Sequence, residues 1–293
     1  MIIALVLMLV VNVTPALATR APLMHPKAKE PLAKLMSSVA VSPIPHTPRE
    51  LPQCTEPLRI TGELPSTAGE TIRYLVDVDG LSVGTIDFKI ERQGSFQGKN
   101  ATEYRSLFKL DGLVASFVPV EGRAASLITT TSHVPLTSTN RYKAEKTNYE
   151  EDVVYSANGL HLSSKRVRDG GQAKKEERDF NAAPLDFVSA YYAMRSFPAG
   201  TSGCALLYAN QRAYTIWVKY AGQETVKTPT GMKPSDKYEL RYASEKSPTV
   251  FNAIIWMATD ATRLPYKMSI DGKRAVEARV QLYEIQPPTT AKQ

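Results

Sequence analysis

The sequence contains few of the side chains that usually bind metal ions. It has four histidines, at positions 25, 46, 133 and 161, and two cysteines, Cys54 and Cys204. No pair of them has the Cys-x-x-Cys or His-x-x-x-His spacing by which common metal sites are recognised. We therefore expect no metal site and no cofactor.

The sequence also lacks the short motifs of the common hydrolases and nucleotide-binding enzymes. It has no Gly-x-Ser-x-Gly, and the glycine-bounded turn Gly200–Gly203 has no lysine of a phosphate-binding loop. The two carboxylates of a glycosidase need only be close in space, so the 29 acidic residues leave a hydrolase open as an alternative. We assign no catalytic residue and expect a binding or structural protein rather than an enzyme.

No apolar run in the sequence reaches the ~20 residues that a helix needs to cross a bilayer. The block Met1–Val11 has the length of the apolar part of a signal peptide, and Pro15 and the small-x-small triplet Ala16–Ala18 follow it. We predict a signal peptide at 1–18 and a periplasmic or secreted protein. A signal peptide usually begins with positively charged residues, and this block contains no Lys or Arg. An uncleaved anchor and a wrongly assigned start codon are therefore the alternatives.

Residues 19–57 are rich in proline and poor in large apolar side chains. Such a segment reads as an extended linker, with one short helix expected at Leu32–Val39. Cys54 lies near its end, and an even pair of cysteines in an oxidising compartment is most simply explained by one disulfide, Cys54–Cys204. The alternative is that both cysteines are small buried apolar residues without a bond.

The formal net charge is +7. A positive excess favours anionic partners such as anionic lipids, lipopolysaccharide or acidic glycans, and it allows peripheral contact with a membrane. A basic surface without a specific ligand is the alternative. We expect no nucleic-acid partner, because the most charged stretch, Arg141–Asp179, has nearly as many acids as bases. The sequence does not indicate an oligomeric state.

A period of two in the apolar residues dominates the region from 58 to 286. Ile72, Tyr74, Val76 and Val78 alternate with polar residues, and Ile86, Phe88 and Ile90 do the same after a glycine-bearing turn. Further strands are expected at 103–110, 124–131, 136–143, 153–155, 161–168, 213–220, 238–242, 253–259, 266–270 and 276–285. The fold class we predict is mostly β, with a single strongly curved antiparallel sheet that forms an open barrel or a sandwich-like fold, followed by a polar tail at 287–293.

One segment departs from this period. From residue 184 to about 196, Leu185, Val188, Tyr191 or Tyr192, and Arg195 follow the spacing of a helix, and Pro184 suits a first helical turn. We predict one helix here, with its apolar face closing one mouth of the curved sheet.

Three segments in this order resemble a known bacterial family. They are Gly69–Tyr74 with Gly80 and Gly84, Pro184–Phe187 continuing to Tyr191–Arg195, and Trp256–Pro265. Together they are similar to the family called domain of unknown function 3108, over roughly Thr67 to Glu284. The resemblance implies an exported envelope protein with a largely antiparallel sheet, and it brings no established activity or catalytic residues.

Four side chains are candidates for ligand binding: Tyr192, Arg195, Trp256 and Arg263. The two arginines with a tyrosine would contact an anionic head group. A structural role is the alternative, in which Asp260 starts a turn, accepts backbone N–H groups and faces Arg263. The tyrosines likewise either pack the core or line a groove for a sugar or acyl chain.

We therefore hypothesise a non-enzymatic envelope protein that binds an amphipathic lipid-like or glycan ligand in the concave face of its sheet. The alternatives are a structural or protein-interaction module, which would dock through a strand edge or the proline-rich segment, and an unrecognised hydrolase.

Overall fold

The structure, a computed structural model, describes residues 53–286 except 59, 61–62, 66, 112–114, 116–119, 145, 247–248 and 272–276. The expected signal peptide at 1–18, the short helix at Leu32–Val39 and the polar tail at 287–293 lie outside the described residues, as does most of the proline-rich segment.

Fourteen strands of the described chain form one antiparallel sheet in the order β8-β7-β6-β5-β4-β3-β2-β1-β14-β13-β12-β11-β10-β9. Almost every strand therefore pairs with its neighbour in sequence, as predicted for a meander, and β1 pairs with β14. The strands are β1 (Thr71–Val78), β2 (Leu81–Phe96), β3 (Lys99–Leu110), β4 (Val120–Thr129), β5 (Pro135–Ala144), β6 (Thr147–Tyr155), β7 (His161–Arg168), β8 (Lys174–Asp179), β9 (Gly203–Ala209), β10 (Arg212–Thr228), β11 (Gly231–Ser244), β12 (Phe251–Ala258), β13 (Pro265–Asp271) and β14 (Glu277–Gln286).

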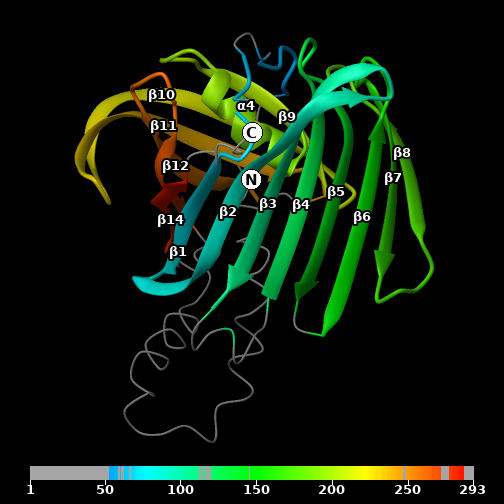
Figure 1. The fold of residues 1–293 in the computed structure, drawn as a ribbon, viewed down its shortest axis with the longest axis horizontal. Helices are drawn as coiled ribbons and strands as arrows, with labels where there is room; N and C mark the ends of the chain where they lie inside the picture. The colour runs from blue at the N-terminus through cyan, green and yellow to red at the C-terminus, as the bar shows by residue number, and fades with distance from the viewer. Residues whose placement is uncertain are drawn as a thin grey trace, which may run out of the picture.

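The sheet curls until its two halves face each other, but it does not close into a barrel (Figure 1). Its edge strands are β8 and β9, which do not pair with one another. Side chains bridge the gap instead: Arg178 of β8 pairs with Glu245, and the buried Glu151 of β6 accepts hydrogen bonds of 2.7 Å from the backbone N–H groups of Asn210 and Gln211. The predicted fold class, a single curved antiparallel sheet, is confirmed.

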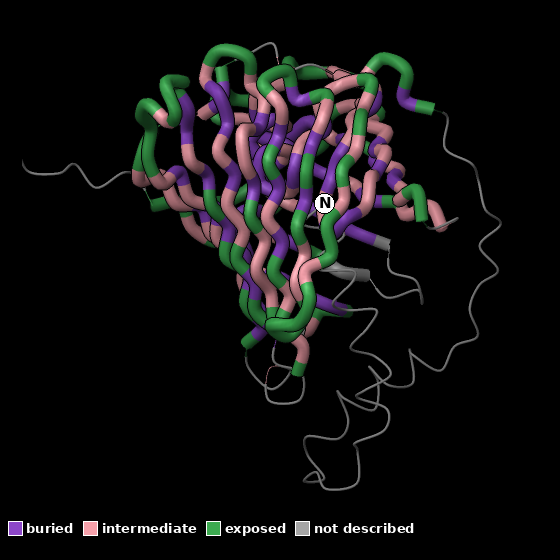
Figure 2. Tube along the Cα trace, turned by 90° about the vertical axis from the view of Figure 1, so that its right-hand side faces the viewer, coloured by how far each residue is buried: buried purple, intermediate pink, exposed green. Residues whose placement is uncertain are grey.

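Alternation of side chains sets the inner and outer faces. Along β1 every second residue is buried, and these residues, Ile72, Tyr74, Val76 and Val78, belong to the main core. Figure 2 shows the same alternation of buried and less buried positions along neighbouring strands. Because side chains in a strand point to opposite faces in turn, the residues between them lie on the outer face.

The predicted helix is α4 (Phe187–Ser196), and it lies between the two halves of the sheet (Figure 1). It packs against β3, β4 and β9. The helix begins three residues later than Pro184 because Leu185 pairs with Leu207 of β9 as a short parallel bridge. Asp186 is then the N-cap, and its carboxylate accepts hydrogen bonds from the backbone N–H groups of Val188 and Ser189.

The edge strands β8 and β9 were not among the predicted strands. The six residues of β8 are all charged and mostly exposed, so β8 has no apolar alternation to reveal it. Charged side chains on an edge strand discourage pairing with other chains. In β9 the apolar residues from Cys204 to Tyr208 are continuous, and a continuous run does not distinguish a strand from a buried helix.

Candidate functional site

An apolar cavity of about 110 Å³ lies between α4 and the concave face of the sheet, mainly against β9–β13. From α4 and the segment before it come Leu185, Phe187, Ala190, Tyr191 and Met194. The strands supply the opposite wall, whose apolar residues include Ala205, Leu207, Ile216, Val218, Leu240, Ile255, Met257, Met268 and Val280. We call this space the inner cavity.

Most polar groups that we describe in the wall of the inner cavity have a partner within the protein, whereas the buried Nε of Arg263 has no partner among the described residues. The hydroxyl groups of Tyr74 and Tyr191 lie 2.8 Å apart. Tyr238 accepts hydrogen bonds from the Arg263 guanidinium, at 2.8 Å, and from the backbone N–H of Gly200, at 3.0 Å. A ligand therefore meets mainly hydrocarbon and aromatic surface, together with the unsatisfied N–H of Arg263.

Burial keeps the two bonded phenols of this wall neutral. It raises the pKa of Tyr191 to about 12, against the opposing charge of Arg195, and it raises the pKa of Tyr74 well above the usual value near 10. Neither phenol is therefore prepared to act as a base at physiological pH.

Two segments cover one end of the inner cavity. One is the loop from Phe197 to Ser202, which is held by the hydrogen bond from Gly200 to Tyr238. The other is the described strap from Gln53 to Leu58, where the N–H of Leu58 donates to the carbonyl of Cys204 at 2.7 Å. Cys54 and Cys204 are joined by a disulfide with a Cα–Cα distance of 5.7 Å. Pro57 of the strap and Leu185 each form a parallel bridge with the edge of β9 that no described strand pairs with, at Cys204 and Leu207 respectively.

Arg263, one of the four candidate residues, lines the inner cavity, but its charge is neutralised. Its guanidinium pairs with the buried carboxylate of Asp236, which is 1% exposed, and donates to the carbonyl of Ala258 at 3.0 Å. The expected turn is present: Asp260 accepts the backbone N–H of Thr262 at 2.9 Å. The carboxylate that pairs with Arg263 is Asp236, and not the expected Asp260.

Arg195 and Tyr192 lie on α4 outside the lining of the inner cavity. The Arg195 side chain is 3% exposed, and its guanidinium bonds the carboxylate of Glu70 at 2.7 Å and the carbonyl of Thr262 at 3.2 Å. The ring of Tyr192 is fully buried against Tyr104, with centroids 4.1 Å apart. Both residues tie the helix to the sheet.

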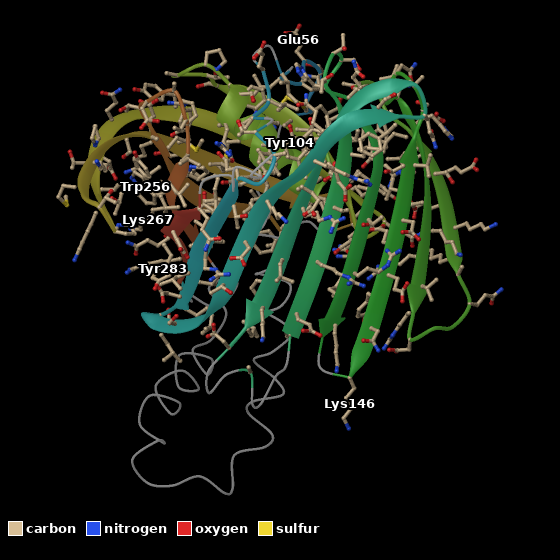
Figure 3. The ribbon with its side chains drawn as sticks, in the orientation of Figure 1. Glu56, Tyr104, Lys146, Trp256, Lys267 and Tyr283 are labelled. Carbon is tan, nitrogen blue, oxygen red and sulfur yellow. A yellow bond between two sulfur atoms is a disulfide. The ribbon has the colours of Figure 1, made fainter. Side chains whose placement is uncertain are left out.

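Trp256 lies on the outer face, away from the other three candidates. Its register partners are Lys237 of β11 and Lys267 of β13, and the Lys267 ammonium sits 4.6 Å above the centre of its ring. Its indole N–H donates to Glu224. Figure 3 places Trp256 and Lys267 together, well apart from Tyr104, the neighbour of Tyr192. The structure thus does not bring the four candidates into one site.

Other residues of the site were not singled out from the sequence. Glu70 and Asp236, the partners of the two arginines, have no local signal, because each lies far from its arginine in the chain. Tyr191 could have been named as a ligand-binding candidate, because it fits the helical spacing as well as Tyr192 does. Among the described residues, no group of three His, Cys, Asp or Glu side chains is placed to hold a metal ion.

The family model described as "Protein of unknown function (DUF3108)" matches residues 73–273, well over half of the chain. The chain belongs to the DUF3108 family. The matched span of this DUF3108 protein runs from β1 into the segment after β13 and includes α4 and most of the wall of the inner cavity. No curated protein matches.

A solved structure of very low sequence identity shares the fold of this DUF3108 protein. The β-barrel-like protein of domain of unknown function DUF1849 from Brucella abortus is 10% identical, with 77% of this chain and 100% of that chain covered and a TM-score of 0.51. An exported protein with a YmcC-like fold from Bacteroides fragilis (9% identity, 77% and 99% covered, TM-score 0.36) and a lipoprotein from Parabacteroides distasonis (10%, 78% and 100%, TM-score 0.33) are more distant. The first likeness concerns the fold alone. In the described part of the chain, no helix has the length and apolar character needed to span a membrane.

Proposed function

We propose that this DUF3108 protein is a binding protein of the cell envelope that holds the apolar end of an amphipathic molecule in the inner cavity. The observation that carries the proposal is the composition of the cavity wall, in which hydrocarbon and aromatic side chains dominate and the hydroxyl groups of Tyr74, Tyr191 and Tyr238 bond to other groups of the protein.

The same observation favours a lipid-like ligand over a glycan in this cavity. A sugar brings hydroxyl groups that need partners, and burying a polar group without a hydrogen bond costs free energy. An alkyl chain has no such need, and each buried CH₂ contributes about 0.8 kcal/mol. The concave face therefore suits the acyl or alkyl part of an amphipathic molecule.

The volume of the inner cavity limits how much of the ligand it takes. An engineered apolar cavity of about 150 Å³ stays dry and binds benzene. A cavity of about 110 Å³ then accommodates a short alkyl end or a small ring, with the rest of the ligand outside. The half-buried Leu58, Phe197 and Thr201, which belong to the covering segments, lie where such a ligand would emerge.

The sequence supports the location given in this proposal. The apolar block at Met1–Val11, followed by Ala16–Ala18, has the features of an export signal. The bond between Cys54 and Cys204 fits an oxidising compartment such as the periplasm or the cell exterior.

Calorimetric titration with a series of fatty acids that differ in chain length tests the proposal. Affinity should rise about fourfold per CH₂, the equivalent of about 0.8 kcal/mol, and then level off once the inner cavity is full. The heat capacity change should be negative, as expected when apolar surface is buried. Binding that does not depend on chain length would argue against an apolar site.

Variants that fill the inner cavity locate the binding. Ala205→Phe on β9 and Ala190→Leu on α4 each place extra atoms in the cavity and should abolish binding. Ala221→Phe, at an exposed position of β10, is the matched control and should bind as the wild type does. A thermal melt of each variant shows that the fold is kept. If a folded Ala205→Phe or Ala190→Leu variant binds fatty acid normally, the inner cavity is not the site.

A further inference from the structure

A wide hollow lies on the outer face of the sheet, opposite the core. It has a volume of about 750 Å³ and is formed by β2, β3, β4 and β5. Ile86, Phe88 and Ile90 of β2 point into the core, so Asp87 and Lys89 between them point into this hollow. We call it the outer groove. Its size falls in the range of ligand sites.

The floor of the outer groove is low because a small residue lies at its centre. Ala125 of β4 is in register with Arg105 of β3 on one side and with Thr139 of β5 on the other. Two leucines flank this floor: Leu107, which is 50% exposed, and Leu127. The groove therefore offers hydroxyl groups, apolar side chains and arginines within one concave surface.

Most charges around the outer groove are paired. Glu103 accepts hydrogen bonds from both Arg92, at 2.7 Å, and Arg105, at 2.8 Å. Burial opposes ionisation of Glu103, but the bonds and charges of the two arginines outweigh burial and lower its pKa. Lys89 pairs with Glu91 at 2.9 Å. Asp87 likewise pairs with Arg73 at 2.7 Å.

Arg123 of β4 is the exception. It is exposed, it lines the outer groove, and no described residue pairs with its guanidinium. Its cross-strand partner on β5 is another arginine, Arg141, which bonds Asp152 at 2.5 Å. Like charges directly opposite each other on neighbouring strands destabilise a sheet. An anion bound between these two side chains would remove that repulsion.

We propose that the outer groove binds an acidic oligosaccharide, with a carboxylate or phosphate group of the sugar on Arg123. A guanidinium bonds such groups in a bidentate manner. The apolar faces of the sugar rings would pack on Leu107 and Leu127, and Thr137 and Thr139 would bond the sugar hydroxyls. The concave shape favours a chain of sugar rings over the flat surface of a membrane.

Titration with an oligouronate of four sugar units, beside a neutral tetrasaccharide, tests this site. The wild type should bind the oligouronate and not the neutral sugar, with an affinity that falls as salt is raised. Arg123→Ala should weaken binding at least tenfold. Arg168→Ala removes the same charge from the exposed face of β7, and this control should bind normally.

A second variant separates loss of the groove from loss of charge. Ala125→Phe keeps every charge but fills the floor of the outer groove, and it should also abolish binding of the oligouronate. Ala205→Phe, in the inner cavity, should leave this binding unchanged, so the two sites can fail separately. Normal oligouronate binding by a folded Arg123→Ala or Ala125→Phe variant, or equal binding of the neutral sugar, would overturn the proposal. So would binding to vesicles of anionic phospholipid but not to the oligouronate.

Discussion

The hydroxyl groups of Tyr74 and Tyr191 lie 2.8 Å apart, which joins β1 to α4 across 117 residues of sequence. The two rings meet edge to face, with centroids 6.1 Å apart, and the Tyr191 ring stacks on Phe88 at 3.7 Å. Each phenol supplies the other with a hydrogen-bond partner at a buried position. This bond fixes the helix over the sheet and leaves the wall of the inner cavity apolar.

Loss of one of these two hydroxyls should destabilise the protein more than loss of both. Tyr191→Phe leaves the buried Tyr74 hydroxyl without this partner, at a cost of about 1–3 kcal/mol. The double variant Tyr74→Phe/Tyr191→Phe leaves neither hydroxyl behind and should recover part of that cost. Urea unfolding of the wild type, both single variants and the double variant measures the four free energies. If the free-energy losses of the two single variants add up to the loss of the double variant, the two hydroxyl groups do not interact.

Breaking the buried ion pair of α4 should be costly. Glu70→Gln leaves the Arg195 guanidinium buried without its counter-charge, and we expect a loss of about 3–5 kcal/mol. Asp87→Asn, which breaks the more exposed Arg73–Asp87 pair, is the matched control and should cost less than about 1 kcal/mol. Equal losses in urea unfolding would show that Arg195 does not depend on Glu70.

The disulfide should stabilise the fold by restricting the unfolded chain. Cys54 and Cys204 are 150 residues apart, for which the chain-entropy model gives about 5 kcal/mol. The double variant Cys54→Ser/Cys204→Ser should therefore melt at a clearly lower temperature than the oxidised wild type. A reducing agent should lower the melting temperature of the wild type and not that of the variant. An unchanged melting temperature of the reduced wild type would contradict this role.

The pair between Arg178 of β8 and Glu245, the residue after β11, should make stability depend on pH in the acid range. The hydrogen bonds from Arg178 lower the pKa of Glu245, against the opposing effect of burial. A carboxylate with a lowered pKa stabilises the fold above its unfolded pKa of about 4.3, and this contribution is lost as the pH falls through the folded pKa.

The variant Glu245→Gln isolates this effect. The stability difference between the wild type and Glu245→Gln should be constant above about pH 5 and should shrink as the pH approaches 3. Urea unfolding at several pH values measures it. A difference that grows on acidification would have the wrong sign for this ion pair.

The sequence was sufficient to predict the curved antiparallel sheet, because its signals are local. The alternation of Ile72, Tyr74, Val76 and Val78 reports directly which face of β1 is buried. The helix was likewise visible from the spacing of Leu185, Val188 and Tyr191. Its first turn was placed too early because the pairing of Leu185 with Leu207, a contact distant in sequence, is not visible locally.

The candidate site was harder to predict from the sequence, because it too depends on contacts between residues that are distant in the chain. Arg195 and Arg263 look like anion-binding residues until Glu70 and Asp236 are seen beside them. In β12 both Trp256 and Met257 are buried, and a register shift lies between them, so alternation alone does not say which of the two faces the cavity. The outer groove depends on the register of four strands, which a single sequence does not specify.

The methyl signals of the methionines test the central claim most directly. Met194, Met257 and Met268 line the inner cavity, whereas Met232 is 63% exposed and is not part of its lining. With methionine labelled at its methyl carbon, addition of a saturating fatty acid should shift the NMR signals of the first three and leave that of Met232 in place. Shifts confined to Met232, or no shifts at a concentration where calorimetry detects binding, would show that the ligand does not enter the inner cavity.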